Sequence, residues 1–154
     1  MMDKYDAQIL HELQLEGRLS NRDLAERIAL SPAPCWRRVK RLEDEGFIRG
    51  YSAQVDHKKI GLQIIAFVEV SLDIHHPETI QNFLSMIANE PGILECHSVT
   101  GQCDYLLKIV SKDMESYETF VSTQLLTAPG IRSVNTLISM RQNKLTSELP
   151  VNLD

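Results

Sequence analysis

Hydrophobic residues recur at intervals of three and four over three short stretches near the start of the chain, residues 3–15, 21–30 and 31–45. This is the period of a helix that buries one face. Ser31 precedes the third stretch as a helix N-cap, and only residues 29–30 separate it from the second stretch. We therefore expect three short helices with a tight bend between the last two, which is a helix-turn-helix.

After the third stretch the pattern changes from helical to alternating. Gly46 is placed to end the helix. The segment 47–56, FIRGYSAQVD, then alternates apolar and polar residues around Gly50, as a small hairpin or a wing strand would. We expect a winged helix-turn-helix domain over residues 1–50, followed by a wing strand and linker over residues 51–63.

The second half of the chain alternates strand patterns with helical patterns. The first and last of these segments are rich in β-branched residues, and two intervening segments repeat apolar residues at helical spacing. In chain order the expected elements occupy residues 64–74, 77–90, 92–100, 104–113, 114–128 and 131–140. Their order, βαββαβ, predicts an α+β fold with a ferredoxin-like domain over residues 64–154, both helices covering one face of an antiparallel sheet. The other face also needs a cover, and a second subunit is the simplest one.

Positive charge is concentrated in the third stretch, although the chain as a whole is acidic. The formal net charge is −5, yet residues 1–61 carry +1 and residues 62–154 carry −6. Within residues 31–42 four basic residues fall in five consecutive positions, and no acidic residue is present. A charge run is usually a solvated helix face. Its place on the second helix of a helix-turn-helix favours DNA instead, because that helix enters the major groove.

On this interpretation the N-terminal end of the third helix approaches DNA. Ser31, Ala33 and Pro34 are small and let the backbone come close, while Arg37 and Arg38 reach phosphates or a guanine. The two later cations suit contacts with the DNA backbone. The tryptophan would lie against the sugar–phosphate wall or pack at the domain boundary, and packing is the preferred interpretation. The expected DNA-binding residues are Ser31, Ala33, Pro34, Trp36, Arg37, Arg38, Lys40 and Arg41.

The sequence carries little that indicates other chemistry. No nucleophile stands near a base at a recognisable motif spacing and no glycine-rich phosphate loop is present, so we expect neither an enzyme nor a cofactor. Three cysteines without an export signal argue against a disulfide framework. Cys96, His97 and Cys103 do not complete a four-ligand metal set, and no apolar run is long enough to span a membrane. We expect a cytoplasmic protein with free thiols and no metal.

The chain resembles a known family over nearly its whole length and in the same order. Residues 3–51 read DKYDAQILHELQLEGRLSNRDLAERIALSPAPCWRRVKRLEDEGFIRGY, which closely resembles the N-terminal domain of the Lrp/AsnC (feast/famine) transcription regulators. The turn GQCDYLLKI and the tail KLTSELPV resemble their C-terminal effector and oligomerisation domain. The resemblance implies a bacterial or archaeal cytoplasmic regulator that binds double-stranded DNA, forms homodimers that assemble into octamers, and often wraps DNA.

Members of this family commonly respond to an amino acid bound between dimers, near the turn that joins the second and third strands of the domain. The resemblance assigns effector binding to Thr100, Gly101, Gln102, Asp104 and Tyr105. The chemistry agrees in part: glycine lets a ligand approach the backbone, a carboxylate can hold an α-ammonium, and turn N–H groups can hold an α-carboxylate. A plain hairpin loop is the alternative. Cys103 stands where members vary, which leaves the identity of the effector open.

The preferred function is therefore a sequence-specific DNA-binding transcriptional regulator that responds to a small effector, expected to be an amino acid. Two alternatives stay open. One is a small-molecule sensor built on the ferredoxin-like half, and the other is a DNA-architectural scaffold without strong sequence specificity. A binding titration against random and selected duplexes separates these classes.

Overall fold

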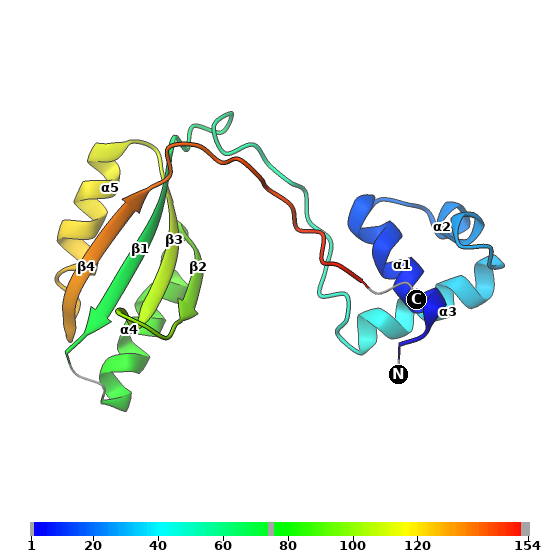
Figure 1. Cartoon of the computed structure of the whole chain (residues 1–154), viewed down its shortest axis with the longest axis horizontal. Coiled ribbons are helices and arrows are strands. Elements are labelled where there is room, and N and C mark those ends of the chain that lie inside the picture. The colour runs from blue at the N-terminus through cyan, green and yellow to red at the C-terminus, as the bar shows by residue number, and fades with distance from the viewer. Residues whose placement is uncertain (1, 74–75, 152–154) are drawn as a thin grey trace. The chain divides into compact units, whose positions relative to one another are not determined.

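The structure, a computed structural model, describes residues 2–73 and 76–151. The chain divides into two compact units, each with its own hydrophobic core (Figure 1). The helical unit comprises Met1–Gln54 and Lys144–Asp154, and the sheet unit comprises Val55–Asn143. Within the described ranges no helix is long and apolar enough to cross a membrane.

Three helices form the core of the helical unit: α1 (Lys4–Leu15), α2 (Asn21–Arg27) and α3 (Pro32–Asp44). Local capping starts the first two. Asp3 and Asp6 form a reciprocal capping box at α1, and the Ser20 hydroxyl accepts the Asp23 N–H at α2. The helices close over a small apolar core that contains Ile9, Leu24, Ala25, Ile28, Cys35 and Leu42. The expectation of three short helices is confirmed.

A tight bend joins α2 to α3. Leu30 donates its N–H to the carbonyl of Ala25 at 2.9 Å, and Ala29 donates to Glu26 at 3.2 Å, so α2 ends in a Schellman motif. This motif requires one residue in the left-handed backbone conformation, and Ala29, with φ = 54°, is that residue. Ala29 therefore adopts a conformation that glycine enters without a Cβ penalty.

The expected wing strand is absent. The structure describes every residue from 47 to 63, and none of them belongs to a strand. Residues 57–61 of this segment form a turn. Phe47, Tyr51 and Val55 stay 51%, 51% and 62% exposed, so this segment has no buried face, and an unpaired hairpin without one is marginal in water. Tyr51 instead donates its hydroxyl to Glu43 at 3.1 Å. Partial burial and this carboxylate raise the pKa of Tyr51 to about 12.

The sheet unit has the expected βαββαβ order. Its elements are β1 (Ile64–Leu72), α4 (Pro77–Asn89), β2 (Ile93–Ser98), β3 (Tyr105–Ser111), α5 (Met114–Phe120), the π-helical turn η1 (Val121–Leu125) and β4 (Ile131–Ile138). The sheet order is β2-β3-β1-β4 with every pairing antiparallel, which is the ferredoxin-like arrangement. The first strand was expected to reach residue 74, which lies outside the described residues.

Alternate residues of the sheet face opposite ways. Val68 and Val70 on β1 are fully buried with Phe83 of α4 and Leu125 of η1, and Figure 1 shows both helices along the same side of the sheet. On the opposite face Phe67 is 38% exposed, and its cross-strand neighbours are Lys108 and Leu137. One face is thus a closed core, and the other keeps apolar side chains exposed.

The C-terminal segment belongs with the helical unit. The sequence grouped all of residues 64–154 with the ferredoxin-like domain, but Lys144–Asp154 clusters with Met1–Gln54. Gln14 of α1 makes two hydrogen bonds with the backbone of Leu149, which accounts for the difference. Such a contact spans the length of the chain and leaves no local pattern in the sequence.

Replacing Ala29 by glycine should raise the free energy of unfolding of the helical unit by about 0.5–1 kcal/mol, because the left-handed conformation no longer carries a Cβ penalty. Urea unfolding followed by Trp36 fluorescence measures it. Ala33→Gly is the matched control, because Ala33 lies inside α3 and should lose up to about 1 kcal/mol. Destabilisation by both substitutions would contradict the proposed role of Ala29.

Candidate nucleic-acid interface and effector turn

The N-terminal end of α3 is exposed. Ser31 is the N-cap residue, but its side chain makes no capping hydrogen bond, and Pro32 occupies the first turn. Ala33 and Arg37 are exposed and Pro34 is half-buried. This end of the helix therefore presents the Ser31 hydroxyl, which makes no capping hydrogen bond, the small side chain of Ala33 and the cation of Arg37.

Trp36 does not pack. Its side chain is 58% exposed, so the preference for a packed boundary residue was wrong. Cys35 and Leu42 form the buried stripe of α3, and Trp36 lies outside it. Trp36 therefore shares the exposed surface with Arg37.

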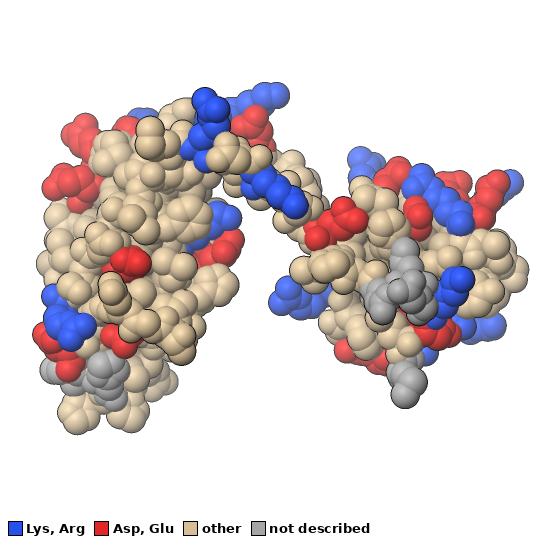
Figure 2. Space-filling view, viewed as in Figure 1, with Lys and Arg blue, Asp and Glu red and all other residues tan. Residues whose placement is uncertain are grey.

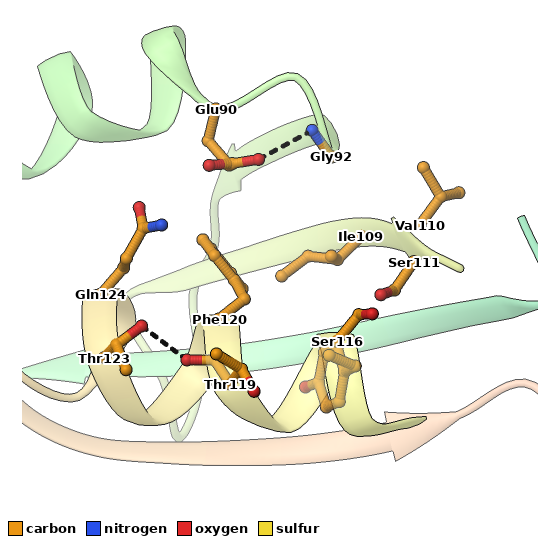
Figure 3. Close-up of a pocket in the computed structure, with 11 residues that line it drawn as sticks. Glu90, Gly92, Ile109, Val110, Ser111, Ser116, Thr119, Phe120, Thr123 and Gln124 are labelled. Carbon is orange, nitrogen blue, oxygen red and sulfur yellow. Dashed lines mark hydrogen bonds between the residues drawn. The ribbon is translucent and has the colours of Figure 1, made fainter. Parts of the chain in front are cut away.

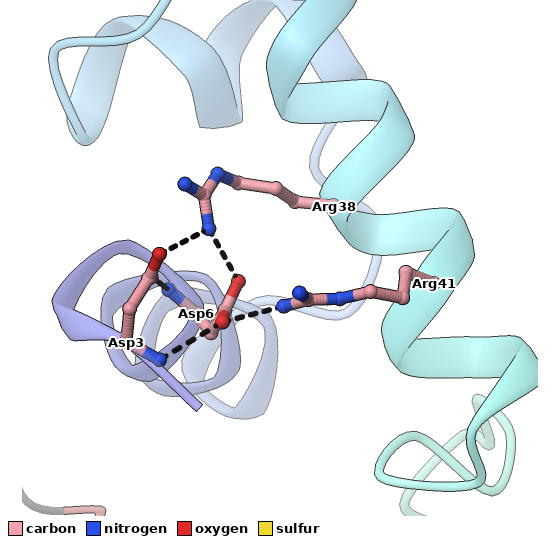
Figure 4. A network of polar contacts seen from close by, with 4 residues as sticks. All are labelled: Asp3, Asp6, Arg38 and Arg41. Carbon is pink, nitrogen blue, oxygen red and sulfur yellow. Dashed lines mark hydrogen bonds and ion pairs between the residues drawn. The ribbon is translucent and has the colours of Figure 1, made fainter. Parts of the chain in front are cut away.

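Two of the expected DNA-binding arginines turn toward α1 instead (Figure 4). Arg38 places Nη1 2.7 Å from Oδ2 of Asp3 and 2.8 Å from Oδ1 of Asp6, and Arg41 places Nη2 2.5 Å from Oδ2 of Asp6. The Asp6 side chain is fully buried, whereas those of Arg38 and Arg41 remain 28% and 41% exposed. A buried carboxylate needs such partners, because an unpaired charge is costly there.

The charges in this network shift each other's proton affinities. The Asp3 and Asp6 carboxylates raise the pKa of Arg38. The Asp6 backbone N–H and then the Arg38 guanidinium lower the pKa of Asp3. Folding thus stabilises ionised Asp3, so its contribution to stability is present above about pH 4 and is lost as the pH falls below that value. Arg38 also lies 5.4 Å from the centre of the Tyr5 ring.

Sequence reasoning missed this role of Asp6. Besides closing the capping box of α1, Asp6 holds α3 against α1. A signal was present: Arg38 and Arg41 are three residues apart and therefore share a helix face. That spacing could not show which acid, if any, they meet.

Several cations on this unit have an acidic partner, and others have none among the described residues. Lys40 lies 2.9 Å from Asp44, and Figure 2 shows Lys and Arg side chains interspersed with Asp and Glu across the visible surface of the helical unit. No ion pair within the described residues involves Arg37. Arg22, near the start of α2, is also exposed and was not among the expected site residues. The first helix of such a motif crosses the DNA backbone, which makes Arg22 a further candidate.

The predicted effector turn lies between β2 and β3. Thr100, Gly101 and Gln102 are exposed together, and Gly101 has φ = 126°, a value that favours glycine. Asp104 anchors the end of the turn to β1: one carboxylate oxygen accepts the Leu72 N–H at 2.7 Å, and its own N–H donates to the Val70 carbonyl at 2.9 Å. The turn is therefore open at Gly101 and fixed at Asp104.

Tyr105 is separate from the exposed turn residues. It is 8% exposed and its ring centroid lies 4.9 Å from that of Phe83 of α4. Its side chain is thus part of the closed core, and it supports the turn from beneath. The structure brings together four of the five predicted effector residues around one turn and places the fifth in the packing below.

A cavity of about 270 Å³ lies elsewhere in the sheet unit, and no sequence motif indicated it (Figure 3). Glu90 lines one side and Gln124, from the π-helical turn, lines another. The Glu90 carboxylate accepts the Gly92 N–H at 3.2 Å, and Thr123 donates its hydroxyl to the Thr119 carbonyl at 2.6 Å. These two groups thus have partners within the unit. Gln124 belongs to the π-helical turn, and such turns often occur at functional sites.

A helix-turn-helix with an exposed recognition helix, joined to a ferredoxin-like unit with an open turn, defines a DNA-binding regulator with a separate sensing domain. Comparison with known families agrees. Residues 2–49 match the model described as winged helix-turn-helix DNA-binding, and residues 65–149 match the Lrp/AsnC ligand-binding domain. The chain belongs to the Lrp/AsnC family of transcriptional regulators.

Similar proteins cover the whole length of the chain. Transcriptional regulator AzlB of Bacillus subtilis is 40% identical over 98% of this chain and 96% of its own. The leucine-responsive regulatory protein of Escherichia coli K12 is 38% identical over 97% of this chain and 92% of its own. A transcriptional regulator of Neisseria meningitidis, solved as its complex with L-Met, superimposes with a TM-score of 0.95 at 38% identity, covering 99% of this chain and 98% of the other. The expected fold class and family are confirmed.

Replacing Asp6 by asparagine should lower the free energy of unfolding of the helical unit by about 3 kcal/mol, because Arg38 and Arg41 lose the buried charge that holds them. Urea unfolding followed by circular dichroism measures the change. Glu26→Gln, at an exposed position of α2, is the control and should change stability by less than about 0.5 kcal/mol. Equal stability of the two variants would show that the network contributes nothing to the fold.

Proposed function

We propose that this regulator reads a specific operator with the N-terminal end of α3 and changes its DNA binding when an amino acid binds the sheet unit. The proposed DNA contact is supported by the exposed N-terminal end of α3. There the Ser31 side chain makes no capping hydrogen bond, and Arg37 makes no ion pair within the described residues. A helix N-terminus also favours phosphate, since its backbone N–H groups point outward.

The four cations of α3 have different roles in this proposal. Arg37 neutralises a phosphate or contacts the edge of a guanine. Lys40 leaves its ion pair with Asp44 and contacts a phosphate instead. Arg38 and Arg41 set the angle of α3 on α1 through Asp6. They act on DNA binding by positioning the helix, which revises their expected role as phosphate contacts.

A substitution pair separates direct contact from positioning. Arg37→Ala should flatten the dependence of log Kd on log salt concentration by about 0.9, which is the loss of one phosphate contact. Arg38→Ala should leave that slope unchanged and lower the stability of the helical unit instead. Fluorescence anisotropy on a duplex selected from a random pool gives both slopes. If Arg38→Ala flattens the slope as much as Arg37→Ala, the arginine leaves the aspartates to bind DNA and the division of roles fails.

An amino-acid effector is supported by chemistry and by a relative. The Neisseria meningitidis regulator was solved with L-Met bound. In this chain the exposed turn Thr100–Gln102 offers backbone N–H groups for a carboxylate, and Asp104 supplies negative charge beside it. A useful switch requires about 1–3 kcal/mol of coupling between effector and DNA, or roughly 5–150-fold in affinity.

Assembly follows from the open face of the sheet. Phe67 and Leu137 are 38% and 51% exposed there as cross-strand neighbours. Figure 2 shows that the middle of the visible surface of this unit is mostly uncharged, with Lys, Arg, Asp and Glu mainly toward its edges. A second copy of the chain would bury these residues, so we propose a homodimer that assembles further into an octamer, with the effector turn at a subunit interface. We also assign the regulator to the cytoplasm, where its DNA is.

The alternative is an architectural protein that binds DNA without sequence preference. The basic helix alone would satisfy it, because phosphate contacts carry no sequence information. Exposed Ser31 and Arg37 favour base readout. Titration against the selected duplex and a scrambled duplex of equal length decides between them: equal affinities would overturn the sequence-specific proposal.

A conservative substitution of Asp104 tests the effector site. Asp104→Asn keeps an oxygen to accept the Leu72 N–H but removes the charge for an ammonium group. It should abolish the thermal shift and the change in DNA affinity that an amino acid produces, while stability without effector is kept. Screening the common L-amino acids on the parent identifies the effector.

Glu90→Gln, in the separate cavity, is the matched control and should respond like the parent. The reverse pattern, in which Glu90→Gln abolishes the response and Asp104→Asn keeps it, would place the effector in the cavity. A parent that responds to no amino acid would overturn the effector assignment.

A further inference from the structure

The C-terminal segment, residues 144–151, is attached to α1 by an unusual backbone contact. Gln14 donates its Nε2 to the Leu149 carbonyl at 3.0 Å, and the Leu149 N–H donates to Oε1 of the same side chain at 2.6 Å. One amide thus satisfies both backbone groups of one residue, as a neighbouring strand would. The two residues are 135 positions apart in sequence.

Other contacts hold the same part of the segment. Gln54 donates its Nε2 to Oγ of Ser147 at 3.3 Å, and Nδ1 of His11 lies 3.6 Å from a carboxylate oxygen of Glu148. Within the segment, the Glu148 N–H donates to Oγ1 of Thr146 at 3.1 Å. Three side chains of the helical unit therefore meet consecutive residues of this segment.

The attachment depends on polar contacts rather than on burial. Leu145 and Leu149 remain 66% and 69% exposed although the segment is docked. Exposed hydrogen bonds contribute modestly to stability because water competes for the same groups. A small change elsewhere in the molecule can release a contact of this strength, whereas a buried apolar contact would open much less often.

The position of the attachment gives it a mechanical consequence. The helical and sheet units are connected covalently twice, at Gln54–Val55 and at Asn143–Lys144. The second connection leads from β4 through residues 139–143 to α1. The same helix carries Asp6, which holds Arg38 and Arg41 of the recognition helix. A chain of contacts therefore runs from the last strand of the sheet unit to α3.

We propose that residues 144–151 form a releasable second tether, which Gln14 clamps to α1 and which limits the freedom of the recognition helix relative to the sheet unit. The docking stands on the contacts alone, while its consequence for DNA rests on the proposed function. Two recognition helices that must reach two half-sites bind more tightly when each is restrained, because less freedom is lost on binding. Releasing the tether weakens two-site binding and spares one-site binding.

Hydrogen exchange tests the docking in the full chain without DNA. Gln14→Ala should speed exchange of the Leu149 amide by about fivefold to thirtyfold, the range that one or two net hydrogen bonds give. Gln8→Ala is the matched control: it is the other glutamine of α1, and no hydrogen bond joins Gln8 to the C-terminal segment in the described structure. It should leave that amide unchanged. Equal exchange in parent, Gln14→Ala and Gln8→Ala would overturn the tether.

DNA binding tests the consequence. On the selected duplex with two half-sites, Gln14→Ala should raise Kd about fivefold while the salt slope stays that of the parent, and Gln8→Ala should match the parent. On the same duplex with one half-site scrambled, all three proteins should bind alike. An equal loss on both duplexes would show that Gln14 supports the fold of the helical unit and is no tether. Failure of the parent to bind either duplex would instead refute the proposed function, and hydrogen exchange would still decide the docking.

Discussion

The buried carboxylate of Asp6 is the constraint on which the DNA-binding half of the molecule depends. It has no access to water, and two guanidinium groups from α3 satisfy it. Removing either side of such a pair leaves an uncompensated charge, so the angle between α1 and α3 is fixed by electrostatics as well as by the small core around Ile9 and Leu42. A unit of this size has little apolar surface to bury, which makes a directional polar contact valuable for specifying one arrangement.

This use of arginine leaves less positive charge for DNA than the sequence suggests. Of the four cations on α3, two hold Asp6 and Lys40 has an acidic neighbour within its own helix. Arg37 is left at the surface beside Trp36. Arginine suits the buried role because its planar fork reaches two oxygens at fixed angles and stays charged when partly desolvated. The interface is therefore built from a few exposed groups on a rigidly placed helix.

The sheet unit combines a rigid frame with local openings. Helices α4 and α5 close one face over Val68 and Val70, with Phe83 of α4 in the same core. The other face keeps Phe67 and Leu137 exposed. The turn before β3 follows the same division: Asp104 is hydrogen-bonded to β1, and Gly101 is open on its Cβ side. The turn is therefore fixed to the sheet at Asp104 and open to solvent at Gly101.

The sequence by itself determined the order and kind of the elements, because these depend on neighbours within a few residues. Apolar spacing placed the three helices and the βαββαβ order, and the N-cap position of Ser31 followed from local chemistry. The alternation after Gly46 misled us, since a strand also requires a partner and a covered face. Only the tertiary structure decided the partners of Arg38 and Arg41, the exposure of Trp36, the burial of Tyr105 and the docking of residues 144–151. These depend on groups that lie from 22 positions apart in sequence, as Phe83 and Tyr105 do, to 137 positions apart, as His11 and Glu148 do. No local period records which distant side chain will occupy the same space.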